Sequence, residues 1–141
     1  MAIFRAIQTQ QYRDKVARYK IGLVSGCQLK DAVLGRGWLK TEGGIEVPDT
    51  SQIPTANPIK SVPNQFKSVP ASFGYNNGVI TVSIETDDFA EGESHLYNIA
   101  AIRDQDNDIA FILLGQPAYI SAERPLTVSA TFEDRIVNIE G

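Results

Sequence analysis

Three carboxylates lie one residue apart in the polar run Asp104-Gln105-Asp106-Asn107-Asp108, a spacing shared with calcium-binding loops. An EF-hand loop also needs glycine at its sixth position and a bidentate glutamate at its twelfth. Counted from Asp104, those positions hold Ile109 and Gly115, so the match fails twice. The run is instead typical of a polar hairpin turn. We therefore predict no metal site, although a calcium site of another kind stays open.

The chain has a single histidine, His95, and a single cysteine, Cys27. His95 follows Glu91 and Glu93, and a carboxylate beside a histidine can act as an acid–base pair. No third residue stands at a spacing that would orient such a pair. A catalytic cysteine needs a base and an electropositive setting, and the only histidine is distant in sequence. We predict no catalytic residue, no cofactor and no enzymatic activity.

Two further patterns are weak signals of ligand binding. Gly35-Arg36-Gly37 lacks the remainder of any phosphate-binding motif and is interpreted as a turn. Trp38, Tyr75 and Tyr97 have aromatic faces that could stack on sugars, but scattered aromatics in a β-rich chain are more often core or interface residues.

Composition excludes several classes of protein. The chain has 141 residues, a length typical of one domain, and a net charge of −4. A nucleic-acid-binding module usually has a clustered basic surplus, which is missing here. The longest apolar run, 109–115, is far too short to cross a bilayer. We therefore expect neither a nucleic-acid partner nor membrane insertion.

The elements that position these residues begin with a short strand over 2–7 and a helix over 10–21. Thr9 is the expected N-cap and Gly22 the expected stop signal. Four apolar residues follow the helical period and predict a core-facing stripe: Tyr12, Val16, Tyr19 and Leu23.

The segment 47–70 differs from the rest because it contains five of the seven prolines. Proline cannot donate to a sheet ladder and disfavours helix at the preceding residue, so we predict an extended arm. Structureless segments of this length are usually functional or linkers. Apolar residues punctuate the arm and suggest that it docks on a surface at intervals.

The second half predicts antiparallel strands over 79–85, 96–103, 109–114, 126–132 and 135–139, with a turn signal at Asn77-Gly78. The near-continuous apolar strand 109–114 indicates burial on both faces. The predicted fold is α+β: a mainly antiparallel, sandwich-like sheet with one N-terminal amphipathic helix and a long proline-rich arm. It forms one domain over 1–141, in three parts: 1–46, 47–70 and 71–141.

Several short motifs follow one another in a recognisable order. A strand leads into a helix that begins at Thr9, and the pair Gly43-Gly44 precedes the segment Val47-Pro48-Asp49-Thr50-Ser51-Gln52. A hairpin of 97–102 and 109–112 follows further on. This order resembles the N-terminal attachment domain of phage tail-collar fibre proteins, which occur in contractile-tailed phages. The resemblance spans most of the chain, but Asn107 stands in the hairpin turn where that family often has glycine.

The resemblance implies a structural protein of the virion, made in the host cytoplasm and located in the tail or baseplate. It implies a homotrimer that attaches a fibre to baseplate proteins, with a second fibre protein as a further partner. The arm would reach a neighbouring subunit or a baseplate protein, although the sequence leaves open whether it docks in cis or in trans. Removing 54–69 would abolish assembly but leave a folded domain. Its expected interface residues are Ile53, Pro54, Pro58, Ile59, Val62, Phe66, Val69 and Phe73.

Two alternatives come from other classes of function. The first is a small carbohydrate-binding β-domain that contacts host glycan through Trp38, Tyr75 and Tyr97. The second is a hydrolase that uses paired acids, although no such pair has a catalytic context.

Overall fold

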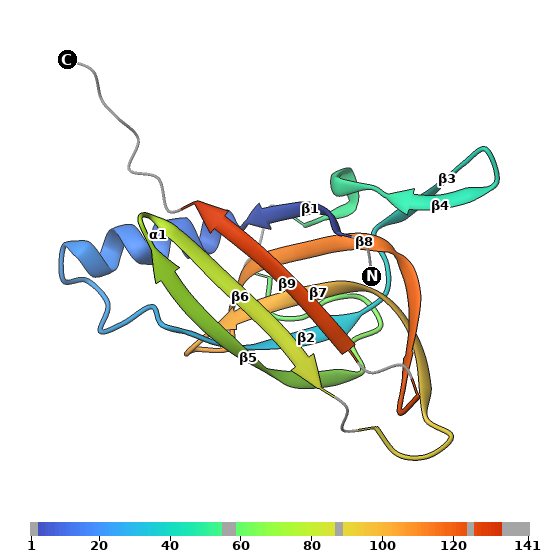
Figure 1. The fold of residues 1–141 in the computed structure, drawn as a ribbon. Coiled ribbons are helices and arrows are strands. Elements are labelled where there is room, and N and C mark those ends of the chain that lie inside the picture. The colour runs from blue at the N-terminus through green and yellow to red at the C-terminus, as the bar shows by residue number, and fades with distance from the viewer. Residues whose placement is uncertain (1–2, 55–58, 87–88, 124–125, 134–141) are drawn as a thin grey trace.

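The computed structural model describes residues 3–54, 59–86, 89–123 and 126–133 (Figure 1). It contains one α-helix, one 3-10 helix and nine strands among these residues. In chain order they are β1 (Ile3–Gln8), α1 (Gln10–Lys20), β2 (Leu29–Gly35), β3 (Leu39–Glu42), β4 (Ile45–Pro48), η1 (Thr50–Gln52), β5 (Lys67–Asn76), β6 (Val79–Thr86), β7 (Ser94–Asp104), β8 (Ile109–Ser121) and β9 (Leu126–Glu133).

Seven strands form one antiparallel sheet in the order β1-β8-β7-β2-β5-β6-β9, and β3 pairs only with β4. The predicted β-rich α+β class is therefore confirmed. The two layers expected of a sandwich are made by a single curved sheet. Val82 of β6 shares a core with Leu113 of β8, although three strands separate β6 from β8 in the sheet. In Figure 1 the strands β5, β6 and β9 accordingly lie in front of β7 and β8.

Helix α1 begins and ends where the sequence predicts. Thr9 has an extended backbone and its side chain accepts a hydrogen bond from the backbone N–H of Tyr12, which satisfies a free donor of the first turn. At the other end Gly22 adopts a φ of 79°, and its N–H donates to the carbonyl of Tyr19. A residue with a Cβ would be strained at this φ, so glycine is the natural helix stop.

The central strands β2, β7 and β8 are buried on both faces, as the apolar run 109–114 predicts. Successive residues point to opposite faces of a strand, so each strand contributes to two cores. Leu34, Ile102 and Leu113 lie in the first core, which α1 covers with Tyr12. Val33, Ile99 and Ile112 lie in the second core.

The second core is covered by residues of the proline-rich segment. Ile59 and Val62 are buried there, and Ile53 packs against them. The segment is also less uniform than one extended arm, because β4, η1 and the first residues of β5 occupy parts of it. Residues 55–58, which include the predicted interface residue Pro58, lie outside the described residues, as does the predicted strand 135–139.

Gly35 marks the place where the proline-rich segment lies directly against β2. A Cβ atom at this position would be 2.4 Å from the carbonyl oxygen of Pro63 and 2.6 Å from the Val62 side chain. The backbone N–H of Arg36 donates to the same Pro63 carbonyl, and that of Phe66 donates to the carbonyl of Leu34. The segment therefore follows the end of β2 with its backbone hydrogen-bonded there.

Candidate functional site

The three aspartates of the β7–β8 turn surround the ammonium group of Lys15, which comes from α1. Its Nζ lies 2.6 Å from Asp104, 3.2 Å from Asp106 and 2.8 Å from Asp108. The Asp104 side chain is fully buried, and its Oδ1 also accepts hydrogen bonds from the backbone N–H groups of Asp106 and Asp108. The turn is therefore polar, as the sequence predicts, and Lys15 offsets one of its three negative charges.

This network shifts two pKa values. Burial opposes the charged form of Lys15, but its hydrogen bonds to the three aspartates outweigh that effect and raise the pKa of the ammonium group. Burial likewise disfavours the Asp108 carboxylate, yet hydrogen bonds from Lys15 and Lys60 lower its pKa on balance. Both shifts favour the charged forms of Lys15 and Asp108 at neutral pH. The cluster can anchor the helix to the turn.

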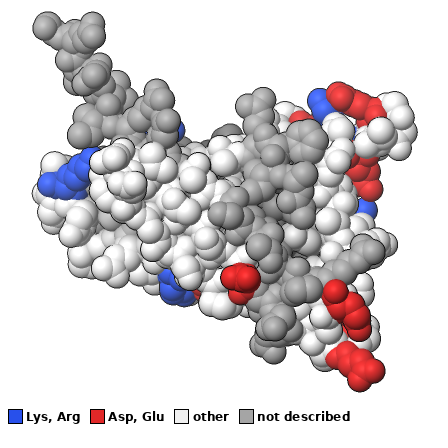
Figure 2. Space-filling view, viewed as in Figure 1, with Lys and Arg blue, Asp and Glu red and all other residues white. Residues whose placement is uncertain are grey.

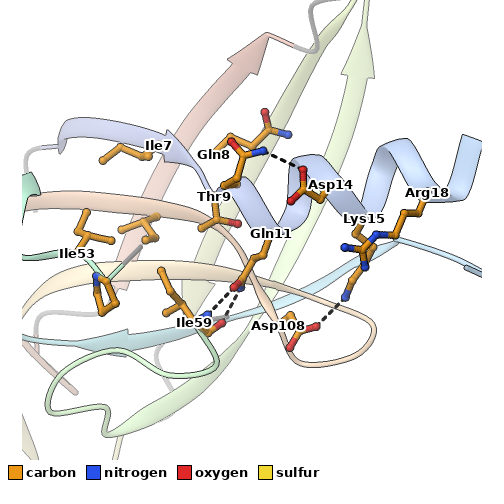
Figure 3. Close-up of a pocket in the computed structure, with 13 residues that line it drawn as sticks. Ile7, Gln8, Thr9, Gln11, Asp14, Lys15, Arg18, Ile53, Ile59 and Asp108 are labelled. Atoms are coloured by element: carbon orange, nitrogen blue, oxygen red, sulfur yellow. Dashed lines mark hydrogen bonds and ion pairs between the residues drawn. The ribbon is translucent and has the colours of Figure 1, made fainter. Parts of the chain in front are cut away.

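Gln11 connects α1 to the proline-rich segment. Its side-chain amide donates to the backbone carbonyls of Ile59 and Ile109, both at 2.7 Å, and accepts from the backbone N–H of Ile59. Figure 3 shows Gln11 pointing toward Ile59 and Lys15 toward Asp108, each from α1. These contacts line one side of a cavity of about 450 Å³, with Ile53 and Ile7 on its apolar side. Gln11 and Lys15, which line it, are engaged in contacts that hold the fold together.

The structure places the predicted interface residues in three different environments. Ile59, Val62 and Val69 are buried in the cores of their own chain, so the prediction that they anchor a neighbouring chain is wrong. Ile53 and Phe66 are half-buried against the same cores.

Only Pro54 and Phe73 among the described interface residues have exposed side chains. Because removing 54–69 would take away core residues and the first residues of β5, that deletion would unfold the domain.

The helix stripe is correct in its first half only. Tyr12 is buried and Val16 packs against the first core. Tyr19 is 50% exposed and Leu23, beyond the end of α1, is 68% exposed, so the prediction is wrong for these two. The sheet ends before it can cover the last turn of the helix. Apolar side chains that were expected in the core are therefore left at the surface.

These side chains belong to an exposed apolar surface at one end of the molecule. We call this surface the apolar end and define it by Tyr19, Ile21, Leu23, Phe73 and Tyr75. Figure 1 shows that the C-terminal end of α1 and the β5–β6 turn both lie there. In Figure 2 the visible acidic residues gather on the opposite side of the view. Large apolar side chains exposed at the same end of a molecule can mark a protein contact.

A shallow, mostly apolar depression, the apolar groove, opens beside α1 and shares Phe73 and Tyr75 with the apolar end. It has a volume of about 450 Å³ and is lined by α1, by the residues that lead into β2 with its first residue, and by the β5–β6 hairpin: Tyr12, Cys27, Gln28, Leu29, Phe73, Gly74, Tyr75 and Ile80. Sequence reasoning missed the groove because its lining comes from four segments of the chain that only the fold brings together.

The three aromatics of the glycan hypothesis do not form one surface. Trp38 and Tyr97 are buried in separate cores, and only Tyr75 is exposed. Trp38 is held inward by Asn98, whose buried side chain donates to the carbonyl of Gly37 and accepts from its N–H, each at 2.9 Å. The proposed sugar platform of Trp38, Tyr75 and Tyr97 is therefore wrong.

His95 and Cys27, the two residues considered for catalysis, both pack against neighbouring side chains. The His95 ring stacks on Phe66 with centroids 4.2 Å apart, and its Nε2 lies 3.5 Å from the Glu93 carboxylate. Cys27 lines the apolar groove, where burial raises the pKa of its thiol. A raised pKa makes the thiolate scarcer at neutral pH, the reverse of what a nucleophile requires.

Comparisons with known proteins return nothing. No family model, curated protein or solved structure matches the chain. In the part of the chain that the structure describes, no helix is long and apolar enough to cross a membrane. Among those same residues, no group of three histidine, cysteine, aspartate or glutamate side chains is arranged to hold a metal ion.

Proposed function

We propose that this protein is a structural component of a virion, a homotrimeric subunit that attaches a tail fibre to the baseplate of a phage. The observation that supports an assembly role is the apolar end. Ile21, Leu23 and Tyr75 are each more than two-thirds exposed there. Burying one such large apolar side chain against a partner would contribute about 1.5–3 kcal/mol to the free energy of association.

The apolar end is also held in a fixed orientation, which favours contacts between subunits. Helix α1 is held to the body by Lys15 at the β7–β8 turn and by Gln11 at Ile59, so its exposed end is presented in one orientation. A preorganised surface loses little conformational entropy on binding, which favours assembly. The attachment role rests further on the order of motifs shared with tail-collar fibre proteins.

The surface is tested by making it polar. Leu23→Ser combined with Tyr75→Ser removes two exposed apolar side chains without disturbing either core. The doubly substituted protein should elute as a single chain of 15.4 kDa under conditions in which the unaltered protein is larger. An unchanged mass would show that this surface does not hold subunits together.

The location is tested separately, on assembled particles. Antibodies against this chain, applied to purified phage-like particles from the organism that encodes it, should label the tail end in electron micrographs. Particles whose tails stay unlabelled, while a blot finds the chain only in the soluble fraction, would contradict a role in the virion.

A further inference from the structure

The β3–β4 hairpin projects from the body of the protein with little to support it. Its two strands pair only with each other, and residues 40–46 are all exposed. Its tip contains Gly43 and Gly44, followed by Ile45, which is 58% exposed. An isolated two-stranded hairpin is marginally stable in water unless it packs against something. A ribbon with an apolar side chain at its tip is therefore suited to enter a partner.

The apolar groove is concave, whereas the β3–β4 hairpin projects, and the groove's lining is mostly apolar like the Ile45 side chain. Its walls are aromatic and aliphatic, contributed by Tyr12, Leu29, Phe73 and others, and its volume of about 450 Å³ can hold one or two side chains. Phe73 and Tyr75 stand exposed at its rim. An aliphatic side chain such as Ile45 would be removed from water on entering it.

Charge favours the same pairing. Arg13 and Lys20 each follow a residue of the α1 stripe, so they lie on one flank of the helix, opposite to Lys15. Both are exposed, and neither has an ion pair among the described residues. The hairpin offers Glu42, which pairs with Ile45 across the two strands and therefore lies on the same face. Its bond to Lys40 is an exposed pair of little energy, which can exchange partners.

The hairpin cannot reach the groove of its own chain. Figure 1 shows the β3–β4 hairpin at one end of the molecule and the C-terminal end of α1 at the other. We propose that the β3–β4 hairpin of one chain docks in the apolar groove of a second copy, with Ile45 inserted and Glu42 facing Arg13 and Lys20.

Such a contact is head-to-tail, because two different surfaces meet. Contacts of this type close into rings when the rotation between copies allows it, and a homotrimer is one such ring. The inference rests on the proposed homotrimer and supplies the surfaces through which it would form.

The lone cysteine provides a direct test, because Cys27 lines the groove. Ile45→Cys places a second thiol at the hairpin tip, and mild oxidation should then join each chain to the next. Non-reducing electrophoresis is expected to show covalent trimers that collapse to single chains on reduction. Two controls use the same fold: Ile45→Cys with Cys27→Ser, which can form dimers at most, and Tyr119→Cys, which puts a thiol on a different exposed position.

A charge exchange gives a second, independent measurement. Glu42→Lys should lower the mass in solution, and so should Arg13→Glu with Lys20→Glu, whereas Glu46→Lys, on the other face of the hairpin, should not. Combining Glu42→Lys with the two helix substitutions should restore the mass. If the unaltered protein is trimeric in solution but the Ile45→Cys variant forms no covalent trimer, or no more than the Tyr119→Cys control, the docking is wrong and the homotrimer stands. A single-chain mass for the unaltered protein overturns the homotrimer and the docking together.

Discussion

The Nζ of Lys15 lies 2.6 Å from Oδ2 of Asp104, whose side chain is fully buried. This contact joins the helix to the β7–β8 turn across 89 positions of sequence. Burying a carboxylate is costly unless a cation and hydrogen bonds compensate it. The Lys15 network therefore fixes the orientation of α1, and with it the position of the apolar end.

We expect Lys15→Met to lower the free energy of unfolding by about 3 kcal/mol, because it leaves the buried Asp104 carboxylate without its cation. The matched control is Lys60→Met. Lys60 contacts only Asp108 of the same turn and its side chain is 69% exposed, so the loss should stay below about 1 kcal/mol. Denaturant unfolding of both variants measures the difference. Equal losses would mean that Lys15 is no more than a surface cation.

Acid should destabilise the protein through the same turn. The pKa of Asp108 is lower in the folded state than its ordinary value. The stability it contributes is therefore fully present above an unfolded pKa of about 3.9, and it is lost as the pH falls through the folded value. We expect the free energy of unfolding to fall below about pH 4.

The Lys15→Met variant should respond differently to acid. Without the Lys15 ammonium group, Asp108 loses a hydrogen bond that lowers its pKa, so the difference in the free energy of unfolding between the variant and the unaltered protein should narrow as the pH falls. Unfolding curves collected across the acidic range test this. A gap that stays constant would show that the carboxylates do not depend on Lys15.

Gly35→Ala should loosen the proline-rich segment. The added methyl group would lie within 2.6 Å of both Pro63 and Val62, so the segment must move, at an expected loss of about 2 kcal/mol. Gly74→Ala is the control, because Gly74 also lies in a strand and a Cβ there meets no atom within 4 Å. Thermal unfolding compares the two. A Gly35→Ala protein as stable as the control would mean that the close approach is not a constraint.

Folding and assembly should respond to different residues. Ile59→Ala removes a core side chain and should lower the free energy of unfolding by about 3 kcal/mol without changing the oligomeric mass. Tyr75→Ser alters a side chain that is 71% exposed. It should lower the oligomeric mass and change the free energy of unfolding by no more than about 0.5 kcal/mol. If Ile59→Ala dissociated a stably folded protein, the proline-rich segment would have to be an intersubunit element after all.

Local signals in the sequence were sufficient to predict where the helix and several strands lie. They were not sufficient to predict which distant segments pack against one another. Thr9 and Gly22 mark the ends of the helix because caps act through neighbouring backbone groups. The alternation of Ile112 and Leu113 between two cores follows from the period of a strand. These features depend on residues close in sequence.

The remaining features depend on distant contacts. The docking of Ile59 on its own sheet follows from Gln11 and the second core, and nothing in the proline spacing distinguishes a segment bound to its own chain from one bound to a neighbour. Lys15 looks like an ordinary charge on a solvated helix face until the turn that holds Asp104 is brought beside it. The two strands around Gly43-Gly44 had a signal that could have indicated a hairpin, a glycine pair between two short runs.

The central claim is that exposed surface at one end of this chain assembles it into a homotrimer, while the proline-rich segment stays within its own chain. The most direct measurement is the mass of the unaltered protein by light scattering coupled to size exclusion, over a range of concentrations. Three chains of 15.4 kDa give a predicted mass of about 46 kDa. A mass of 15.4 kDa at every concentration would contradict the account.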